Sequence, residues 1–528
     1  STTITVTIQD IYDYSVNVIT PQGCIQQALR RLRLPAHIPH PTIIIEQDSG
    51  KQVFCRGDQS FDSLILSPTD YHTGSIYNWY VNGFLIQTYG KLRLTPPPDS
   101  TAVINLIQIS ATGCSNIGYD TILISVFHCC NSQDSTAFFS DSSSNYTSGF
   151  TNMTMNVLGD FFIDTNFVIS GSQLLMDSTS HIFILPGKTL TINNSNLKAC
   201  HRMWNGIFLT DSTSYLILNG DTIEDAFFAI HDTVGAKISV SNCFFNKNRR
   251  GVYLFGSATS MLSTIHSSTF TSQDNSGSMV PTGDNESAYS GIEVKNMNGW
   301  ALGGASNSLL FRHLYYGIKA ESSSLTISNC DFQDMKRYTF HYDNLRTSYA
   351  QWGYDGYGIY SKNANTGSQN IQVHSSNFKN CGIAIAIYNK INSSIDSCTI
   401  DSSRIASILI HSPGTAVISI SKNTVSNFFN GISLIEPRLA NSVSVQGNYF
   451  DTPSNLNTSP FAFEAVNWAI KLQNRLPGRT NASIKQNHMK HQRKGIYLNG
   501  CDHVDVVENT IELLDTNYTG KMYGIWAV

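Results

Sequence analysis

The chain has 528 residues and a formal net charge of −4, from 34 Lys and Arg against 38 Asp and Glu. Charged residues make up only 14 %, so the scattered cations exclude a basic nucleic-acid-binding face. A hydrophobic share of 41 % with 27 Phe and 24 Tyr excludes a disordered chain, and no run of about 20 apolar residues is present that could span a membrane. The low charge and the surface rich in Ser, Thr and Asn are typical of an extracellular protein.

Residues 1–40 form an N-terminal segment that we interpret as a linker or as the end of a preceding module. Residues 2–8 alternate Thr with Ile or Val, which predicts a strand and leaves no place for a signal peptide. Residues 23–34 carry a pattern of one helical turn, and prolines follow it. No function is predicted for this segment.

Residues 41–128 contain short predicted strands separated by turn signals. Asn82-Gly83 directly follows the strand-like residues 79–81 and predicts a hairpin. The order Cys55, Trp79, Cys114 and the sequences around these residues resemble the immunoglobulin-like modules of secreted Bacteroidota proteins. The resemblance implies a β-sandwich, a disulfide between Cys55 and Cys114 packed by the tryptophan, and a spacer or binding role.

A junction, residues 129–150, leads into residues 151–528, where two short sequence units recur. The first unit is a small or polar residue, any residue and a large apolar residue, and nine of its twelve spacings are 22–26 residues. The second unit is Gly-Ile-x-apolar and follows about eight residues later. The first unit begins at Ser172, Ser195, Asp221, Cys243, Ser268, Ser308, Cys330, Ser376, Cys398, Asn423, Asn448, Asn487 and Asn509.

Short strands at such a period, without helical periodicity, predict a parallel β-helix. The two units resemble the right-handed parallel β-helix repeat family, which includes pectate lyases, polygalacturonases, phage tailspikes and bacterial surface proteins. The resemblance implies an all-β fold of about 13 coils, and the family hosts both enzymes and adhesins. We expect the first residue of each unit, here called the ladder residue, to face inward at a bend of the coil.

The ladder positions divide the cysteines into two classes. Cys243, Cys330 and Cys398 are ladder residues, so we predict buried, free thiols there. One residue of the pair Cys129 and Cys130 could reach Cys200 and staple the junction. The pairing of Cys24, Cys129, Cys130, Cys200, Cys381 and Cys501 stays open.

Three long spacings place the insertions 271–290, 336–357 and 452–468 between a ladder residue and the next Gly-Ile unit. Because coils stack in register, we expect these insertions to leave the rod at the same turn and to form the wall of a groove. Aromatic rings beside charged side chains suit sugar rings, although the rings could instead pack back onto the helix. The predicted glycan-binding residues are Tyr338, Tyr342, Trp352, Tyr354, Tyr357, Tyr360 and Trp468.

The outward residues of the Gly-Ile strands form a predicted row, in which Glu293 and Lys319 are neighbours and Ala384 follows Tyr360. With His341 they are the catalytic candidates for acid–base chemistry, and the alternative is a surface ion pair. The chain lacks the Asp-Asp pair and the Gly-His-Gly of polygalacturonases. A pectate-lyase-like site would need clustered Asp for Ca²⁺ and an adjacent Arg or Lys, and only Asp502 and Asp505 cluster, with Arg493 and Lys494 nearby. No metal site or cofactor is therefore predicted, and Ca²⁺ stays an open alternative without a specific motif.

These observations predict a secreted or cell-surface β-helix protein that acts as a glycan-binding, adhesive or structural module. Its expected partners are a polysaccharide, a cell-surface glycan or another extracellular protein module, and neither nucleic acid nor membrane insertion is expected. The alternative is a polysaccharide lyase or glycoside hydrolase acting in a groove on the flank, so the question of an enzyme stays open. Residues 523–528 begin a fresh coil, and we therefore expect the native protein to continue.

Overall fold

The structure is a computed structural model, and the chain in it forms two units, Ser1–Ser132 and Gln133–Val528. The boundary between the units falls within the predicted junction 129–150. The residues described are 12–19, 25–32, 41–45, 53–55, 64–69, 75–87, 90–94, 102–109, 117–127, 137–138, 140–146, 149–199, 203–257, 262–272, 289–304, 308–335, 356–364, 369–389, 391–411, 413, 415–437, 440, 442–451, 468–513 and 522–528.

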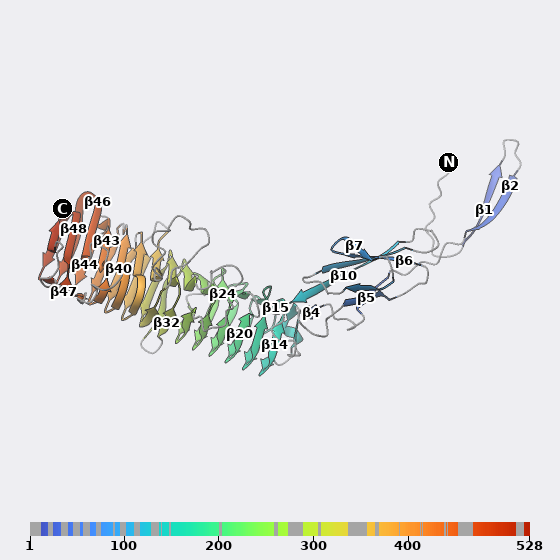
Figure 1. Cartoon of the computed structure of the whole chain (residues 1–528), viewed down its shortest axis with the longest axis horizontal. Helices are drawn as coiled ribbons and strands as arrows, with labels where there is room; N and C mark the ends of the chain where they lie inside the picture. Colours follow the sequence, from blue (N-terminus) through green and yellow to red (C-terminus); the bar gives the residue numbers. More distant parts are fainter. Residues whose placement is uncertain are drawn as a thin grey trace. The chain divides into compact units, whose positions relative to one another are not determined.

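The first unit contains a hairpin and two small sheets (Figure 1). The hairpin pairs β1 (Tyr12–Ile19) with β2 (Ile25–Leu32), so the helical turn predicted at 23–34 is wrong. Cross-strand pairing with β1 decides the conformation there, because a single turn is too short to form a stable helix alone. One sheet has the order β3 (Ile43–Ile45), β5 (Leu64–Pro68), β8 (Leu92–Leu94), and the other has the order β4 (Val53–Cys55), β10 (Ile117–Phe127), β9 (Ala102–Ile109), β6 (Ile76–Val81), β7 (Phe84–Gln87).

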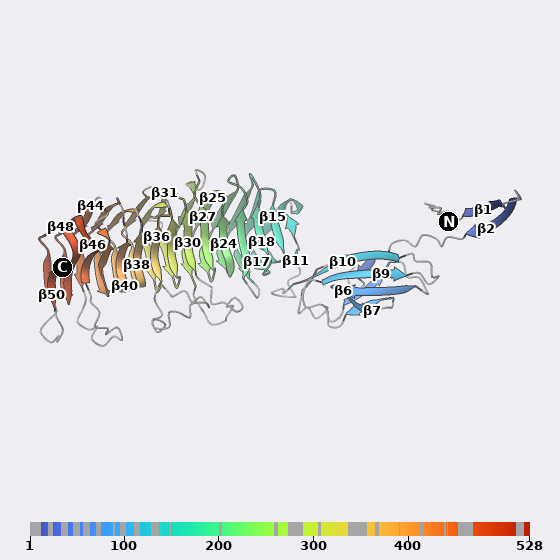
Figure 2. The same ribbon diagram turned by 90° about the horizontal axis from the view of Figure 1, so that it is seen from above.

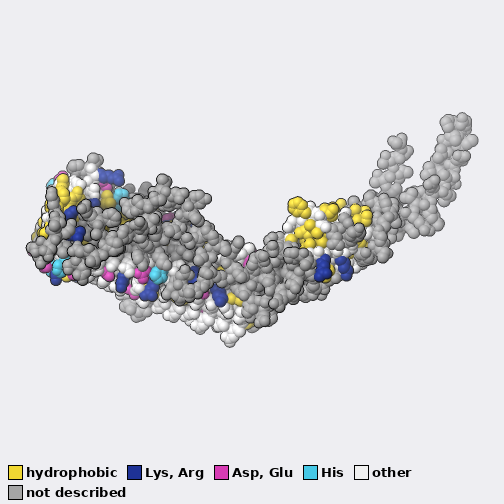
Figure 3. Space-filling model, viewed as in Figure 1, with side chains coloured by type: hydrophobic (Ala, Val, Ile, Leu, Met, Phe, Trp, Pro, Cys, Tyr) yellow, Lys and Arg dark blue, Asp and Glu magenta, His cyan; other side chains and the backbone are white. Residues whose placement is uncertain are grey.

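The two sheets share one apolar core, as a sandwich requires. Trp79 lies in this core with no exposed surface. The predicted hairpin is present, since Asn82 and Gly83 join β6 to β7 with φ of 49° and 84°. Cys114 and the side chain of Cys55 lie outside the described residues, so their disulfide stays a prediction, as does the immunoglobulin assignment. Figure 3 shows an apolar area over this unit, where Ile76, Phe84, Leu85 and Ile86 are exposed.

The second unit is a parallel β-solenoid, which confirms the predicted parallel β-helix (Figures 1 and 2). Each coil supplies strands to three stacks, A, B and C, and the strands follow one another in the order C, A, B. The described residues contain no α-helix; the 3₁₀ turn η1 (Ser143–Asn145) precedes the first full coil, and Leu262 and Pro437 also have the 3₁₀ conformation. Stack A contains β11 (Ala137–Phe138), β14 (Thr154–Val157), β17 (Gln173–Met176), β20 (Asn196–Ala199), β23 (Thr222–Glu224), β26 (Phe244–Asn246), β29 (Thr269–Thr271), β32 (Leu309–Arg312), β35 (Cys330–Gln333), β42 (Thr424–Phe428), β45 (Tyr449–Asp451), β47 (His488–Gln492) and β49 (Thr510–Leu513).

Stacks B and C complete the coils, and four long strands pass through a bend and belong to two stacks. Stack B contains β12 (Asp141–Ser142), β15 (Asp160–Ile163), β18 (His181–Ile184), β21 (Trp204–Leu209), β24 (Ala226–Asp232), β27 (Arg250–Phe255), β30 (Ser290–Lys295), β33 (Tyr316–Glu321), β36 (Tyr357–Lys362), β43 (Ile432–Ile435) and β50 (Tyr523–Ala527). Stack C contains β13 (Phe150–Thr151), β16 (Phe167–Ser170), β19 (Thr189–Asn193), β22 (Tyr215–Asn219), β25 (Lys237–Ser241), β28 (Thr264–His266), β31 (Asn298–Gly303), β34 (Ser324–Ser328), β37 (Gln369–His374), β39 (Ile391–Asp396), β41 (Val417–Ser421) and β44 (Ser442–Gln446). The long strands are β38 (Asn377–Tyr388) and β40 (Thr399–His411), shared by A and B, and β46 (Trp468–Lys485) and β48 (Lys494–Val507), shared by B and C.

The ladder residues face inward at the bend between stacks C and A, as predicted. A ladder side chain accepts a hydrogen bond from the backbone N–H of the ladder residue one coil earlier, and this removes a buried, unpaired donor. In this way Asn448 Oδ1 accepts from Asn423 N at 3.0 Å, and Asn487 Oδ1 accepts from Asn448 N at 3.0 Å. Cys243, Cys330 and Cys398 are buried and free, which confirms the prediction. Cys381, also buried, and Cys501 are free as well.

One ladder position lies one residue later than predicted. Leu309, not Ser308, pairs with Cys330 in the ladder, and Phe311 continues the inward row that Leu310 was expected to continue. The packing of aromatic rings explains this register. Phe311 stacks between Phe270 and Phe332 with centroid distances of 5.2 Å and 4.8 Å, and these rings belong to a five-ring stack of Phe245, Phe270, Phe311, Phe332 and Phe378.

The glycine of the Gly-Ile unit is required where such a ring lies above it. A Cβ added to Gly317 would lie 2.6 Å from Phe332 Cδ1 and 2.6 Å from the carbonyl oxygen of Gly358. Gly251, Gly291 and Gly358 meet the ring of the next coil in the same way. The repeated glycine therefore reflects close packing between successive coils.

Candidate functional site

The predicted outward row of stack B is present, with one correction. Ala384 was expected beside Tyr360, but Ala386 pairs with Tyr360 because Ile385, not Ile383, pairs with Ile359. The preceding Gly382-Ile383 unit is therefore two residues out of register. The observed row is Phe208, His231, Tyr253, Glu293, Lys319, Tyr360, Ala386, Leu409, Ser433, Lys471, Tyr497 and Trp526.

Glu293 is the centre of an ion-pair network on this row. Its carboxylate contacts Arg250 Nε at 3.0 Å and Lys319 Nζ at 2.7 Å, and Lys319 Nζ also contacts Glu321 at 3.2 Å. Glu293 is only 6 % exposed, so the predicted neighbours form a buried pair, not a surface pair. Burial alone would lower the pKa of Lys319, but the hydrogen bond and charge of Glu293 outweigh it and raise this pKa above its ordinary value.

Tyrosine rings surround the ion-pair network. Tyr316 has ring centroids of Tyr289, Tyr315, Tyr357 and Tyr360 within 4.5–5.3 Å. Burial, followed by the neighbouring tyrosines, raises the pKa of Tyr316, so the phenol stays neutral. We call Arg250, Tyr289, Glu293, Tyr315, Tyr316, Lys319, Glu321, Tyr357 and Tyr360 the tyrosine cluster.

The cations of the network lie against the tyrosine faces. The guanidinium of Arg250 lies 5.0 Å from the ring centroid of Tyr289, and Lys319 Nζ lies 5.4 Å from the same centroid. These separations are those of cation–π contacts. Tyr289, Tyr357 and Tyr360 are half-buried, so they present part of their rings to solvent.

Sequence reasoning identified Glu293, Lys319, Tyr357 and Tyr360 but missed the other members of the cluster. The residues immediately before the glycine of successive Gly-Ile units also pair in register. They are Arg250, Ser290, Tyr316 and Tyr357. The available signal was therefore a second row, one position before the glycine, which carries Arg and Tyr.

Trp468 was predicted to bind a glycan, but its ring is only 2 % exposed. It packs 4.9 Å from Tyr497 and 5.5 Å from Lys494 Nζ, measured to the ring centroids. Burial lowers the pKa of both Lys471 and Lys494 in this region. For this ring, the structure favours the alternative in which aromatic side chains pack onto the helix.

The other predicted site residues lie outside the described residues. These are His341, Tyr338, Tyr342, Trp352 and Tyr354. The strands around the insertions are described, however. Each insertion follows a stack A strand (β29, β35 or β45) and precedes a stack B strand (β30, β36 or β46), so the roots share one turn of the coil (Figure 2).

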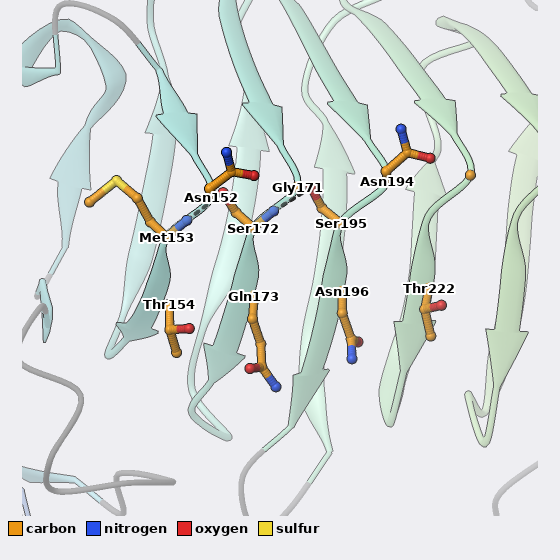
Figure 4. A pocket seen from close by; sticks show the side chains of 11 residues that line it. Asn152, Met153, Thr154, Gly171, Ser172, Gln173, Asn194, Ser195, Asn196 and Thr222 are labelled. Atoms are coloured by element: carbon orange, nitrogen blue, oxygen red, sulfur yellow. Dashed lines mark hydrogen bonds between the residues drawn. The ribbon is translucent and has the colours of Figure 1, made fainter.

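A pocket of about 530 Å³, here called the polar pocket, lies at the bend between stacks C and A in the early coils (Figure 4). Thr154, Gln173, Asn196 and Thr222 lie on the four successive strands β14, β17, β20 and β23. The preceding bends use the left-handed backbone region, with Asn and Gly alternating. Asn152, Gly171, Asn194 and Gly220 have φ of 51°, 58°, 47° and 73°.

No group of three His, Cys, Asp or Glu residues that could hold a metal ion occurs in the described part of the chain. No helix among the same residues is long and apolar enough to cross a membrane.

Comparisons with known proteins add little to this geometry. No family model and no curated protein matches the chain. Among solved structures, the periplasmic alginate epimerase AlgG has 11 % identity and a TM-score of 0.24, over 71 % of this chain and 85 % of that chain. The catalytic unit of a thermostable GH87 alpha-1,3-glucanase from Streptomyces thermodiastaticus strain HF3-3 has 10 % identity and a TM-score of 0.18, over 87 % and 88 %. Likenesses of this size carry no argument about function, and the assignment of the chain as a parallel β-solenoid depends on its own strand pairing.

Proposed function

We propose that the chain is a secreted or cell-surface module that binds a polysaccharide or cell-surface glycan on the outward face of stack B. The observation that carries this proposal is the tyrosine cluster. Half-buried rings of Tyr289, Tyr357 and Tyr360 lie beside the charged groups of Arg250, Lys319 and Glu321. This combination suits sugars, whose C–H faces pack on aromatic rings while their hydroxyls take hydrogen bonds.

The ion pairs fix the cluster in place before any ligand arrives. Glu293 holds Arg250 and Lys319 against the tyrosine faces, so these side chains lose little freedom on binding. A rigid aromatic surface with fixed hydrogen-bond donors loses little conformational entropy when a ligand binds, and this favours affinity. Each of the three insertions lies between a stack A strand and a stack B strand. We therefore expect them to form the wall of a groove beside the tyrosine cluster, which lies on stack B.

A glycan array on the intact chain tests the proposal. We expect Tyr316→Ala combined with Tyr360→Ala to weaken binding at least tenfold, which corresponds to about 1.4 kcal/mol. Tyr215→Ala is the matched control, because Tyr215 also carries a cation–π contact, with Lys237 Nζ at 4.7 Å, but lies on stack C. Equal losses in both variants, or no glycan bound by the parent chain, would contradict the proposal.

A polysaccharide lyase or glycoside hydrolase is the second candidate, and one observation favours it. Glu293 Oε1 and Glu321 Oε1 both contact Lys319 Nζ, at 2.7 Å and 3.2 Å. The two carboxylate oxygens are therefore less than about 6 Å apart. Paired carboxylates at about 5–5.5 Å are typical of retaining glycosidases. Release of reducing ends or unsaturated products by the parent chain, lost in Glu321→Gln, would establish this candidate. Binding without any product would reject it.

A further inference from the structure

The polar pocket brings together polar side chains of successive coils that do not bond to one another. At several other positions of the stack, polar side chains of adjacent coils bond to one another. Asn246 Nδ2 donates to Glu224 Oε1 at 2.8 Å, and Asn377 Nδ2 donates to Asp331 Oδ1 at 2.8 Å. The side chains of the pocket form no such bonds among the described residues. The residues whose side chains form no hydrogen bond to another described residue are Asn152, Thr154, Gln173, Asn194, Asn196 and Thr222.

We infer that the polar pocket is a second binding site, and that it takes a neutral oligosaccharide. No Asp, Glu, Lys, Arg or His lines the pocket, so nothing there recognises an ionic ligand. Amides and hydroxyls each donate and accept, as sugar hydroxyls do. Met153 lines the same pocket and is 36 % exposed, which provides one apolar surface for a sugar face. The inference is independent of the proposed function on stack B.

The register of the strands indicates a linear ligand. Thr154, Gln173, Asn196 and Thr222 are paired in sequence, so each coil contributes one polar side chain to a straight row. Adjacent strands in a sheet are about 4.8 Å apart, close to the length of one sugar ring in an extended chain. A chain of about four sugars lying along the row could therefore meet one side chain per ring.

The bends keep the pocket open. A Cβ added to Gly171 would lie 2.4 Å from Asn152 Oδ1, and one added to Gly220 would lie 2.5 Å from Asn194 Oδ1. The alternation of Asn and Gly therefore lets each amide lie over the glycine of the next coil. Side chains at both glycines would displace the amides that line the pocket.

The test is isothermal titration of the full chain with cello-, malto- and mannohexaose, and with a uronic-acid hexasaccharide as the charged comparison. We expect at least one neutral hexasaccharide to bind, and Gln173→Ala combined with Asn196→Ala to weaken it at least tenfold. Thr222→Ala should weaken it as well, whereas Thr424→Ala should not. Thr424 is the matched control because it occupies the same strand position as Thr222 in a later coil, outside the pocket.

The side chains replaced make no hydrogen bonds among the described residues, so the variants should fold, and circular dichroism checks this. The variant Tyr316→Ala combined with Tyr360→Ala separates this inference from the proposed function, because it should leave binding in the pocket unchanged. Three results would overturn the inference: no neutral hexasaccharide binds, the Gln173 and Asn196 substitutions leave the affinity unchanged, or the uronic-acid hexasaccharide binds more tightly than every neutral one.

Discussion

Replacing Gly317 with alanine should destabilise the solenoid, because the added methyl group has no free space. Its Cβ would lie 2.6 Å from the backbone oxygen of Gly358 and 2.6 Å from Phe332 Cδ1. The backbone oxygen belongs to a paired strand and cannot shift cheaply. The ring cannot move along the rod either, since Phe311 and Phe378 stack on it at 4.8 Å and 4.7 Å.

The magnitude follows from two opposing effects. Forcing an extra methyl group into a packed core typically costs about 1–3 kcal/mol. Replacing glycine with alanine also reduces the freedom of the unfolded chain, which stabilises the folded state by roughly 0.4–1 kcal/mol. We therefore expect Gly317→Ala to lower the free energy of unfolding by about 1–2 kcal/mol.

Urea unfolding followed by circular dichroism measures this difference, provided that the m-value stays unchanged. Gly524→Ala is the matched control, because Gly524 begins the same Gly-Ile unit but an added Cβ there meets nothing within 4 Å. That variant should be unchanged or slightly more stable. A Gly317→Ala protein as stable as the parent, or an equal loss in both variants, would refute the packing argument.

Three further predictions concern buried polar groups. Burial raises the pKa of Asp221 from 3.8 to about 6, so its contribution to stability is present at low pH and is lost as pH rises from about 4 to 6. The difference in unfolding free energy between Asp221→Asn and the parent should therefore change by roughly 2 kcal/mol from pH 4 to pH 7, and a constant difference would contradict this. Burial raises the pKa of the Cys330 and Cys398 thiols to about 12, so iodoacetamide at pH 8 should modify them, by mass spectrometry, only after unfolding. Glu293→Gln should cost about 3 kcal/mol in urea unfolding, because two cations lose their buried carboxylate; a loss below about 1 kcal/mol would contradict the burial of the pair.

The solenoid could be predicted from the sequence because its repeat is local. Each coil places the same residue types at the same bend, so spacing alone revealed the ladder and the Gly-Ile strands. Register could not be fixed in the same way. The ladder pattern favours Ser308, but Leu309 occupies the ladder position, because Phe311 stacks with rings that are 21 and 41 residues away in sequence.

The candidate site could be predicted only in part, for a similar reason. Glu293 and Lys319 are aligned by the strands that carry them, so their contact followed from register. Arg250 contacts Glu293 diagonally. It pairs with Ser290 in the next coil, and Glu293 lies three residues further along that strand, so the two residues belong to different rows. The burial of Trp468 depends on later strands that supply Tyr497 and Trp526, which the local sequence does not reveal.

The direction of the ladder bonds has a consequence for biosynthesis. The backbone N–H of one ladder residue bonds to a side chain that the ribosome adds later, 25 residues later for Asn423 and Asn448 but 46 residues later for Cys330 and Ser376. Until that side chain emerges, the newest coil has an open strand edge and an unpaired donor. At about 5–20 residues per second, the wait at Cys330 is roughly 2–9 seconds, about twice that at Asn423. Between these two positions, the coil of Cys330 is the one whose edge stays open longer during synthesis.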